Sequence, residues 1–146
     1  MSNKHPSASS AMSARGLASS LQTLEDAFAE FVRDLYGSLL PRRLRELLIL
    51  HISWHAESEL LWRAHLEHAR PLGISDLQIA AIQQGQVEAF VFNSEESSLL
   101  RILSDRRSPD YGEAWNRLTM HFSPEQIDQV FMTERFYLNI ATGLTD

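Results

Sequence analysis

The chain has 146 residues, the size of one ordinary domain, and its 44% apolar and 22% charged residues are typical of a globular protein. Its formal net charge of −6 argues against non-specific binding to nucleic acid or to an acidic membrane. The sequence contains no cysteine, which excludes disulfides, thiolate metal sites and cysteine nucleophiles. A protein without disulfides is consistent with a cytoplasmic location, which we expect here.

The beginning of the chain is rich in serine and alanine and contains no apolar segment of the kind found in secretory signals. Because it has little apolar surface to bury, we expect residues 1–16 to form a disordered tail. Residues 17–146 are expected to form a single helical domain. The nearly apolar run 47–52 is too short to span a bilayer, so we expect no membrane partner.

Apolar residues recur at helical spacing along most of the chain, and no segment shows the alternation of a strand. Ser20 is a suitable N-cap for the first helix, and Gly37 a suitable end. The segment Ser123-Pro124-Glu125-Gln126 combines an N-cap, a proline at the first helical position and a glutamine placed to close a capping box. We predict an all-α fold of about six to seven helices, over residues 20–36, 42–56, 59–72, 76–84, 95–105, 111–122 and 124–141.

Four histidines form two pairs at helical spacing, His51 with His55 and His65 with His68. Either pair could bind a metal ion, and together they could form a four-ligand site between two helices. The alternative is that these imidazoles are packed or solvated without a common partner. No acidic residue completes a metalloprotease motif, so we expect no metal site here.

His65 occupies a mostly apolar stripe of its helix, whereas the opposite stripe carries charges that alternate in sign. The first stripe contains Ser58, Trp62, Ala69 and Leu72, and the second contains Glu59, Arg63, Glu67 and Arg70. We therefore expect His65 to point inward. An inward imidazole is suited to general acid–base catalysis, and equally to a hydrogen-bonded role in the core.

Glu46 lies early in its helix, where it could pair with Arg42 on the surface. It also adjoins buried-looking leucines, and in that setting it would be a desolvated base with a raised pKa. Glu59 has Arg63 four residues later, so a surface ion pair is favoured over a catalytic role.

Glu134 has apolar neighbours three and four residues away, namely Val130, Phe131, Tyr137 and Leu138. A carboxylate in that setting meets a histidine or arginine, or faces a pocket or subunit interface. The favoured alternative places Glu134 at the edge of the apolar stripe, beside Arg135.

The remaining candidates are basic and aromatic. Arg42, Arg43 and Arg45 form the one dense basic cluster, which could meet an anionic substrate or lie on the surface. The spacing of the aromatic side chains favours packing in the core, with the lining of a pocket as the second interpretation. These residues are Trp54, Trp62, Trp115, Phe131, Phe136 and Tyr137.

Three segments carry a resemblance to a known family. Residues 40–50 read LPRRLRELLIL, residues 58–65 read SELLWRAH, and residues 69–76 read ARPLGISD. In this order they resemble the R-E-L-x-I-L helix, the S-E-Y-E-W-x-x-H helix and the A-R-x-x-G-L-(S/T)-D exit of the carboxymuconolactone decarboxylase family. Residues 122–126 and 136–139 are similar to its last helix, so the resemblance covers most of residues 40–142.

The resemblance implies an alkyl hydroperoxidase D-like fold that assembles into trimers or hexamers. The decarboxylases of the family need no metal or organic cofactor. The redox relatives use a C-x-x-C pair, whose positions here are Ser58 and Leu61, so thiol peroxidase chemistry is excluded. In the same alignment Glu46 matches the relay glutamate and His65 the histidine.

Two positions depart from the family pattern. The second glutamate of S-E-Y-E-W is Leu61 here, and Glu134 stands where relatives usually carry a small apolar residue.

We expect a cofactor-independent lyase or isomerase acting on a small oxygenated carboxylate or lactone. His65 would be the general acid and base, Glu46 would orient it, and Arg45 would hold a carboxylate, with Glu59, Trp62 and Glu134 completing the substrate site. The alternative from a different class is a non-catalytic helical oligomer that binds a ligand or has a structural role. A member of this family that no longer catalyses a reaction would also lack the cysteines and one glutamate.

Overall fold

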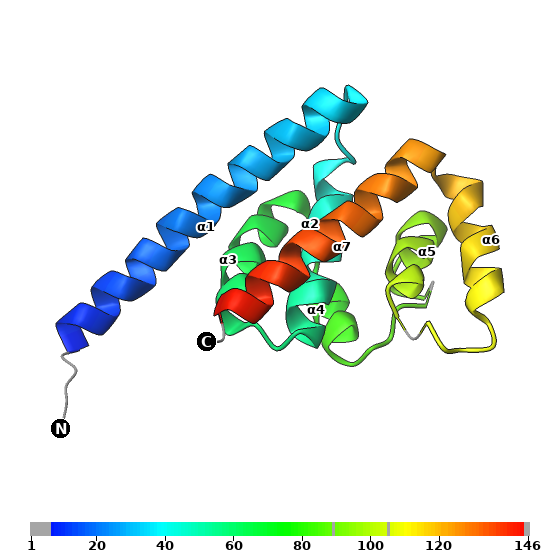
Figure 1. Ribbon diagram of the computed structural model, residues 1–146. Helices are drawn as coiled ribbons and strands as arrows, with labels where there is room; N and C mark the ends of the chain where they lie inside the picture. Colours follow the sequence, from blue (N-terminus) through cyan, green and yellow to red (C-terminus); the bar gives the residue numbers. More distant parts are fainter. Residues whose placement is uncertain (1–6, 89, 105, 145–146) are drawn as a thin grey trace. The chain divides into compact units, whose positions relative to one another are not determined.

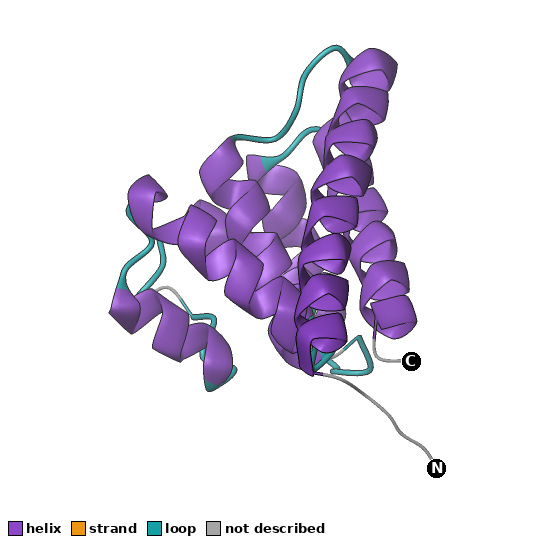
Figure 2. Cartoon of the chain, turned by 90° about the vertical axis from the view of Figure 1, so that its left-hand side faces the viewer, coloured by secondary structure: helices purple, strands orange, loops and turns teal. Residues whose placement is uncertain are grey.

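The computed structural model describes residues 7–88, 90–104 and 106–144, and every regular element in them is a helix (Figures 1 and 2). The elements are α1 (Ser7–Tyr36), α2 (Arg42–His55), α3 (Glu59–Ala69), the 3-10 turn η1 (Arg70–Leu72), α4 (Asp76–Gln83), α5 (Ser94–Ile102), α6 (Tyr111–His121) and α7 (Pro124–Leu144). The predicted all-α fold is thereby confirmed.

The chain divides into two compact units, of which the first, residues 1–38, contains α1. This helix begins at Ser7, well before the predicted start at Ser20. Of the tail expected over residues 1–16, residues 1–6 lie outside the described part of the chain, whereas residues 7–16 are helical. Alanine is the strongest helix former, and this stretch is rich in alanine and free of proline, so the helix continues where there is little apolar surface to bury.

The second unit, residues 39–146, is organised around α2. This helix packs against α3, α4, α5 and α7, while α6 packs against α5 and α7. As a result α2 is buried nearly all round: Leu47, Leu48 and Leu50 are fully inaccessible. The same helix carries three buried polar side chains, Glu46, His51 and Ser53. Buried polar groups need partners, and the partner of Glu46 defines the candidate site described below.

Several helix ends in the second unit follow the capping signals of the sequence. The break predicted at residues 57–58 is present: Glu57 has a left-handed φ of 56°, and the side chain of Ser58 caps α3. Ser123 and Gln126 form the predicted capping box at the start of α7. The predicted helix 59–72 is instead α3 followed by η1, because Pro71 has no N–H with which to continue the α-helical ladder.

Asn93 caps α5 in a reciprocal box with Glu96, so this helix begins at Ser94. The last helix, α7, ends at Leu144, beyond the predicted end at residue 141. No helix among the described residues is long and apolar enough to cross a membrane.

Arg43 connects α2 to three other parts of its unit. Its guanidinium donates to Oε2 of Glu96 at 2.7 Å, to the Leu72 carbonyl at 3.1 Å and to Oε1 of Gln78 at 3.1 Å. This member of the basic cluster therefore has a structural role, joining α2 to α4, α5 and η1.

Candidate functional site

A histidine and a glutamate form a close side-chain contact in the core of the second unit. Nδ1 of His65 lies 2.6 Å from Oε1 of Glu46, and the two side chains are 2% and 6% exposed. His65 therefore points inward as its helical stripe predicted, and the partner of Glu46 is this imidazole. A hydrogen bond at this distance between two ionisable side chains that are shielded from water is strong.

Two neighbouring helices hold the dyad, defined here as Glu46 and His65. Glu46 lies on α2 and His65 on α3, and these two helices pack against each other. On α3 the stripe that faces inward consists of Leu61, Trp62, His65 and Ala69. The dyad is therefore rigidly placed, because both of its members stand on packed helices rather than on loops.

Two further rings surround His65. The ring of Tyr137, from α7, meets it edge-on with centroids 5.6 Å apart. The ring of His68, one turn along α3, meets it edge-on at 5.0 Å. Nδ1 of His68 is 3.8 Å from Oε1 of Glu46, and the His68 side chain is 33% exposed. His68 thus gives the otherwise buried dyad a side facing solvent.

The other histidine pair does not join this site. Among the described residues, the group of three or more potential metal ligands is Glu46, His65 and His68, whose ligand atoms lie within 4.8 Å of one another. The interpretation of four histidines around one metal is therefore wrong. The helix α2, which carries His51 and His55, contributes the Glu46 carboxylate to this group and neither of those histidines.

His51 is buried in the core of α2. Burial, together with the nearby His55, lowers the pKa of His51 to about 4, against the opposing effect of a backbone hydrogen bond with Leu103. His51 is therefore neutral at pH 7. Its ring stacks at a tilt on that of His55, with centroids 4.2 Å apart.

A pocket of about 650 Å³ opens where α2 meets α3. Its walls are Ser53, Trp54, Glu57, Ser58, Glu59, Trp62 and Arg63. The indoles of Trp54 and Trp62 lie 5.0 Å apart, and the indole N–H of Trp54 donates to the Gln83 carbonyl at 3.1 Å. We call this cavity the tryptophan pocket.

The tryptophan pocket contains two of the predicted substrate-binding residues. Trp62 forms part of its wall, and Glu59 lies there in an exposed ion pair with Arg63. The pairing predicted for Glu59 is confirmed. His65 is on the same stripe of α3 as Ser58 and Trp62, but it is almost inaccessible and does not line the pocket.

The other two predicted substrate-binding residues are elsewhere. Nε of Arg45 donates to the Leu40 carbonyl at 2.9 Å, next to the start of α2. Glu134 pairs with Arg106, which raises the pKa of the arginine, and not with Arg135. The guanidinium of Arg106 also lies over the ring of Phe131, 5.5 Å from its centroid. Neither Arg45 nor Glu134 lines the tryptophan pocket.

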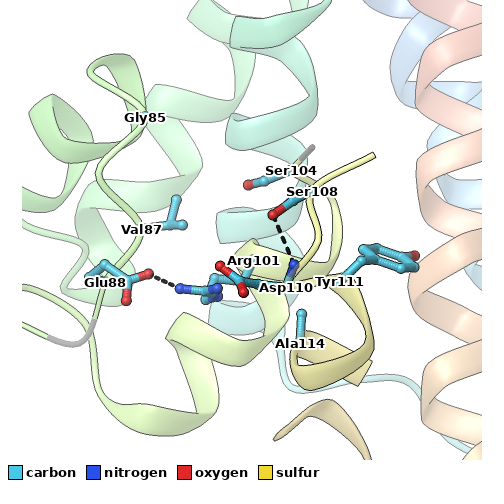
Figure 3. A pocket seen from close by; sticks show the side chains of 9 residues that line it. All are labelled: Gly85, Val87, Glu88, Arg101, Ser104, Ser108, Asp110, Tyr111 and Ala114. Atoms are coloured by element: carbon cyan, nitrogen blue, oxygen red, sulfur yellow. Dashed lines mark hydrogen bonds and ion pairs between the residues drawn. The ribbon is translucent and has the colours of Figure 1, made fainter. Parts of the chain in front are cut away.

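A second, smaller pocket of about 210 Å³ was not predicted from the sequence (Figure 3). Its lining consists of Gly85, Val87, Glu88, Arg101, Ser104, Ser108, Asp110, Tyr111 and Ala114. Arg101 pairs with Glu88 across it, and Oγ of Ser108 accepts from the backbone N–H of Asp110 at 3.2 Å. These polar groups satisfy one another, which favours a structural role for them.

Sequence reasoning missed two features of the site. Tyr137 was predicted as a core residue and an apolar neighbour of Glu134, but the contact of its ring with His65 was not predicted. His68 was considered only as a metal ligand beside the other histidines, and its approach to Glu46 depends on how α2 packs on α3. Comparisons with models of protein families, with curated proteins and with solved structures found no match.

Proposed function

We propose that the protein is a cofactor-independent lyase or isomerase that uses His65 as general acid and base on a small oxygenated carboxylate or lactone. The observation that carries the proposal is the 2.6 Å contact between Nδ1 of His65 and Oε1 of Glu46, both buried. A second argument is the resemblance to the carboxymuconolactone decarboxylase family, in which Glu46 and His65 match the relay glutamate and histidine.

The dyad divides the work between its two members. When Nδ1–H of His65 donates to Glu46, the carboxylate fixes the tautomer and the orientation of the ring, and it stabilises the imidazolium. Nε2 is then the nitrogen that exchanges a proton with the substrate. Positioning of this kind contributes on the order of 10²- to 10⁴-fold to proton-transfer steps.

In a decarboxylation, the bond between the ring carbon and the carboxyl group breaks, carbon dioxide leaves, and the electron pair remains as an enolate. The imidazolium of His65 then delivers its proton to that carbon. In an isomerisation, neutral His65 removes a proton from one carbon and returns it to another. Both reactions conserve electrons, so neither requires a redox cofactor.

The tryptophan pocket is the proposed substrate site. Its indoles at Trp54 and Trp62 suit a flat ring, and its volume of about 650 Å³ fits a small molecule. The guanidinium of Arg63 is the cation in its wall that would bind a substrate carboxylate. To do so, Arg63 would release Glu59 and pair with the substrate in its place. Arg45, the residue predicted for that role, donates to a backbone carbonyl instead. Because His65 is 2% exposed and does not line the pocket, turnover requires side chains to move and open a path to its ring.

The test is a substrate screen in D₂O with carboxylated lactones, cyclic anhydrides and β-keto acids. We expect deuterium at one product carbon and a loss of kcat of at least about 100-fold in His65→Ala. Glu46→Gln should lose less, because the ring remains but its orientation is no longer fixed by a carboxylate. Exposed His121 supplies the matched control, His121→Ala. Undiminished turnover in His65→Ala would remove His65 from the mechanism.

One observation favours the alternative of a non-catalytic ligand-binding oligomer. His65 is 2% exposed and neither His65 nor Glu46 lines the pocket, so a ligand can occupy the pocket without meeting the dyad. Tight binding of a screened compound with no turnover, and equal affinity in His65→Ala, would support that alternative.

A further inference from the structure

We propose that Glu46, His65 and His68 form a binding site for a divalent transition metal ion, with Zn²⁺ as its probe, and that the ion switches the dyad off. Binding itself follows from the three side chains alone. The effect on turnover rests on the proposed function.

The ligand set is complete enough for such an ion. One carboxylate and two imidazoles are supplied by two packed helices, and their ligand atoms lie within 4.8 Å of one another. Nitrogen-rich sets of this kind favour Zn²⁺, Co²⁺ or Ni²⁺ over Mg²⁺ and Ca²⁺, which prefer oxygen. Three protein ligands leave a further coordination position for water.

The two donor separations from Glu46 require only a small adjustment. Tetrahedral Zn²⁺ holds its donors at about 2.0 Å, which separates any two donors by about 3.3 Å. In the structure the two separations from Oε1 of Glu46 are 2.6 Å to His65 and 3.8 Å to His68, so they bracket that value. The separation to His65 must widen by about 0.7 Å and the separation to His68 must shorten by about 0.5 Å. The two histidine ligand atoms lie within 4.8 Å of each other and must reach the same separation, which side-chain rotation supplies.

The surroundings favour a cation and give it a way in. The Glu46 carboxylate is 6% exposed, and a buried carboxylate is costly unless a positive charge or hydrogen bonds compensate it. His68 is 33% exposed, which provides an entry path on the solvent side of the dyad.

Metal binding and acid–base catalysis exclude each other in this arrangement. An ion at Nδ1 of His65 takes the lone pair of that nitrogen, and the proton shared with Glu46 passes to solvent. The imidazole then cannot become the imidazolium that protonates a carbon. Occupation of the site would therefore inhibit a reaction that depends on the dyad.

The direct test is titration of the full-length protein, stripped with chelator, with ZnCl₂ by isothermal titration calorimetry. We expect one ion per chain, and affinity lower by on the order of 100-fold in His68→Ala. The matched control is His55→Ala, because His55 is exposed and belongs to the other histidine pair. It should bind Zn²⁺ like the wild type. Thermal melts followed by circular dichroism verify that each variant is folded.

Co²⁺ supplies a second readout that does not depend on turnover. Visible absorption of the Co²⁺-loaded protein should show the intense d–d bands of four or five ligands, and His68→Ala should lose them. Equal affinity in His68→Ala and wild type, loss of binding in His55→Ala, or no saturable binding would each overturn the proposal.

The two proposals can fail separately. If the substrate screen finds no turnover, calorimetry still decides whether the metal site exists. If turnover is found, Zn²⁺ should inhibit the wild type at concentrations where His68→Ala keeps its own metal-free rate. Equal inhibition of both would overturn the switch.

Discussion

Nε of Arg43 and Oε2 of Glu96 are 2.7 Å apart and join α2 to α5. Glu96 is 5% exposed at its side chain and Arg43 is 32% exposed. Oε1 of the same glutamate accepts from the backbone N–H of Asn93 at 3.2 Å, so one carboxylate both caps α5 and anchors it to α2. Removing one partner would leave the other charge in a mostly desolvated setting without its counter-ion, so we expect loss of the pair to destabilise the second unit.

Arg43→Met should therefore lower the free energy of unfolding by about 2 kcal/mol. Breaking a fully buried ion pair lowers the free energy of unfolding by more than this. Because Arg43 is partly exposed, solvent screening reduces the loss. Urea denaturation followed by circular dichroism measures it. The control is Arg63→Met, in the exposed pair with Glu59, which should change stability by no more than about 0.5 kcal/mol. Equal effects of the two substitutions would contradict a structural role for Arg43.

Ser58→Ala should lower stability by about 1 kcal/mol, because the Ser58 side chain accepts the backbone N–H of Leu61 as the N-cap of α3. Ser20→Ala is the matched test of a helix start. The sequence alone predicted Ser20 as an N-cap, whereas the structure places it inside α1. Within a helix alanine is the better residue, so Ser20→Ala should be neutral or slightly stabilising. A loss of stability in Ser20→Ala would instead support Ser20 as the N-cap of a shorter first helix.

Most helix boundaries in the second unit could be predicted because their determinants are local. Gly73 closes η1 at a φ of 82°, Ser75 caps α4, and Ser123 begins α7, and each acts within four residues of its own position. The start of α5 was missed by one residue although Asn93 and Glu96 stand at capping-box spacing. The start of α1 was missed because burial was used as the criterion, and helix propensity decided it.

The dyad could be predicted because two independent patterns indicated the same residues. The helical stripe turned His65 inward, and the family resemblance matched both members. The partners of Arg43 and Glu134 could not be predicted in this way. Glu96 and Arg106 are 53 and 28 residues away from them in the sequence, and such contacts depend on how helices dock. The position of His68 beside Glu46 depends on docking for the same reason.

The low pKa of His51 makes stability fall on mild acidification. The folded value, about 4, lies below the ordinary 6.5, so the unfolded chain binds more protons between these values. Stability from this group is full above pH 6.5 and is lost as the pH falls towards 4, by up to about 3 kcal/mol. Urea titrations at pH 7.5, 6 and 5 should show the loss, and His51→Leu should reduce it. The control, His121→Gln at an exposed position, should leave the pH dependence unchanged.

The tryptophan pocket predicts a fluorescence signal for ligand binding. A planar aromatic carboxylate seated against Trp54 and Trp62 should quench and shift tryptophan emission, since it stacks on or displaces water from their indoles. Trp115 is the third tryptophan of the chain and packs on Phe131 at 5.7 Å instead. Trp115→Phe should therefore keep the ligand-dependent change, whereas Trp54→Phe should lose a large part of it. Trp54 is 39% exposed, so that variant should fold. If Trp115→Phe alone abolished the change, the ligand would bind near α6 and α7, and the pocket between α2 and α3 would not be the substrate site.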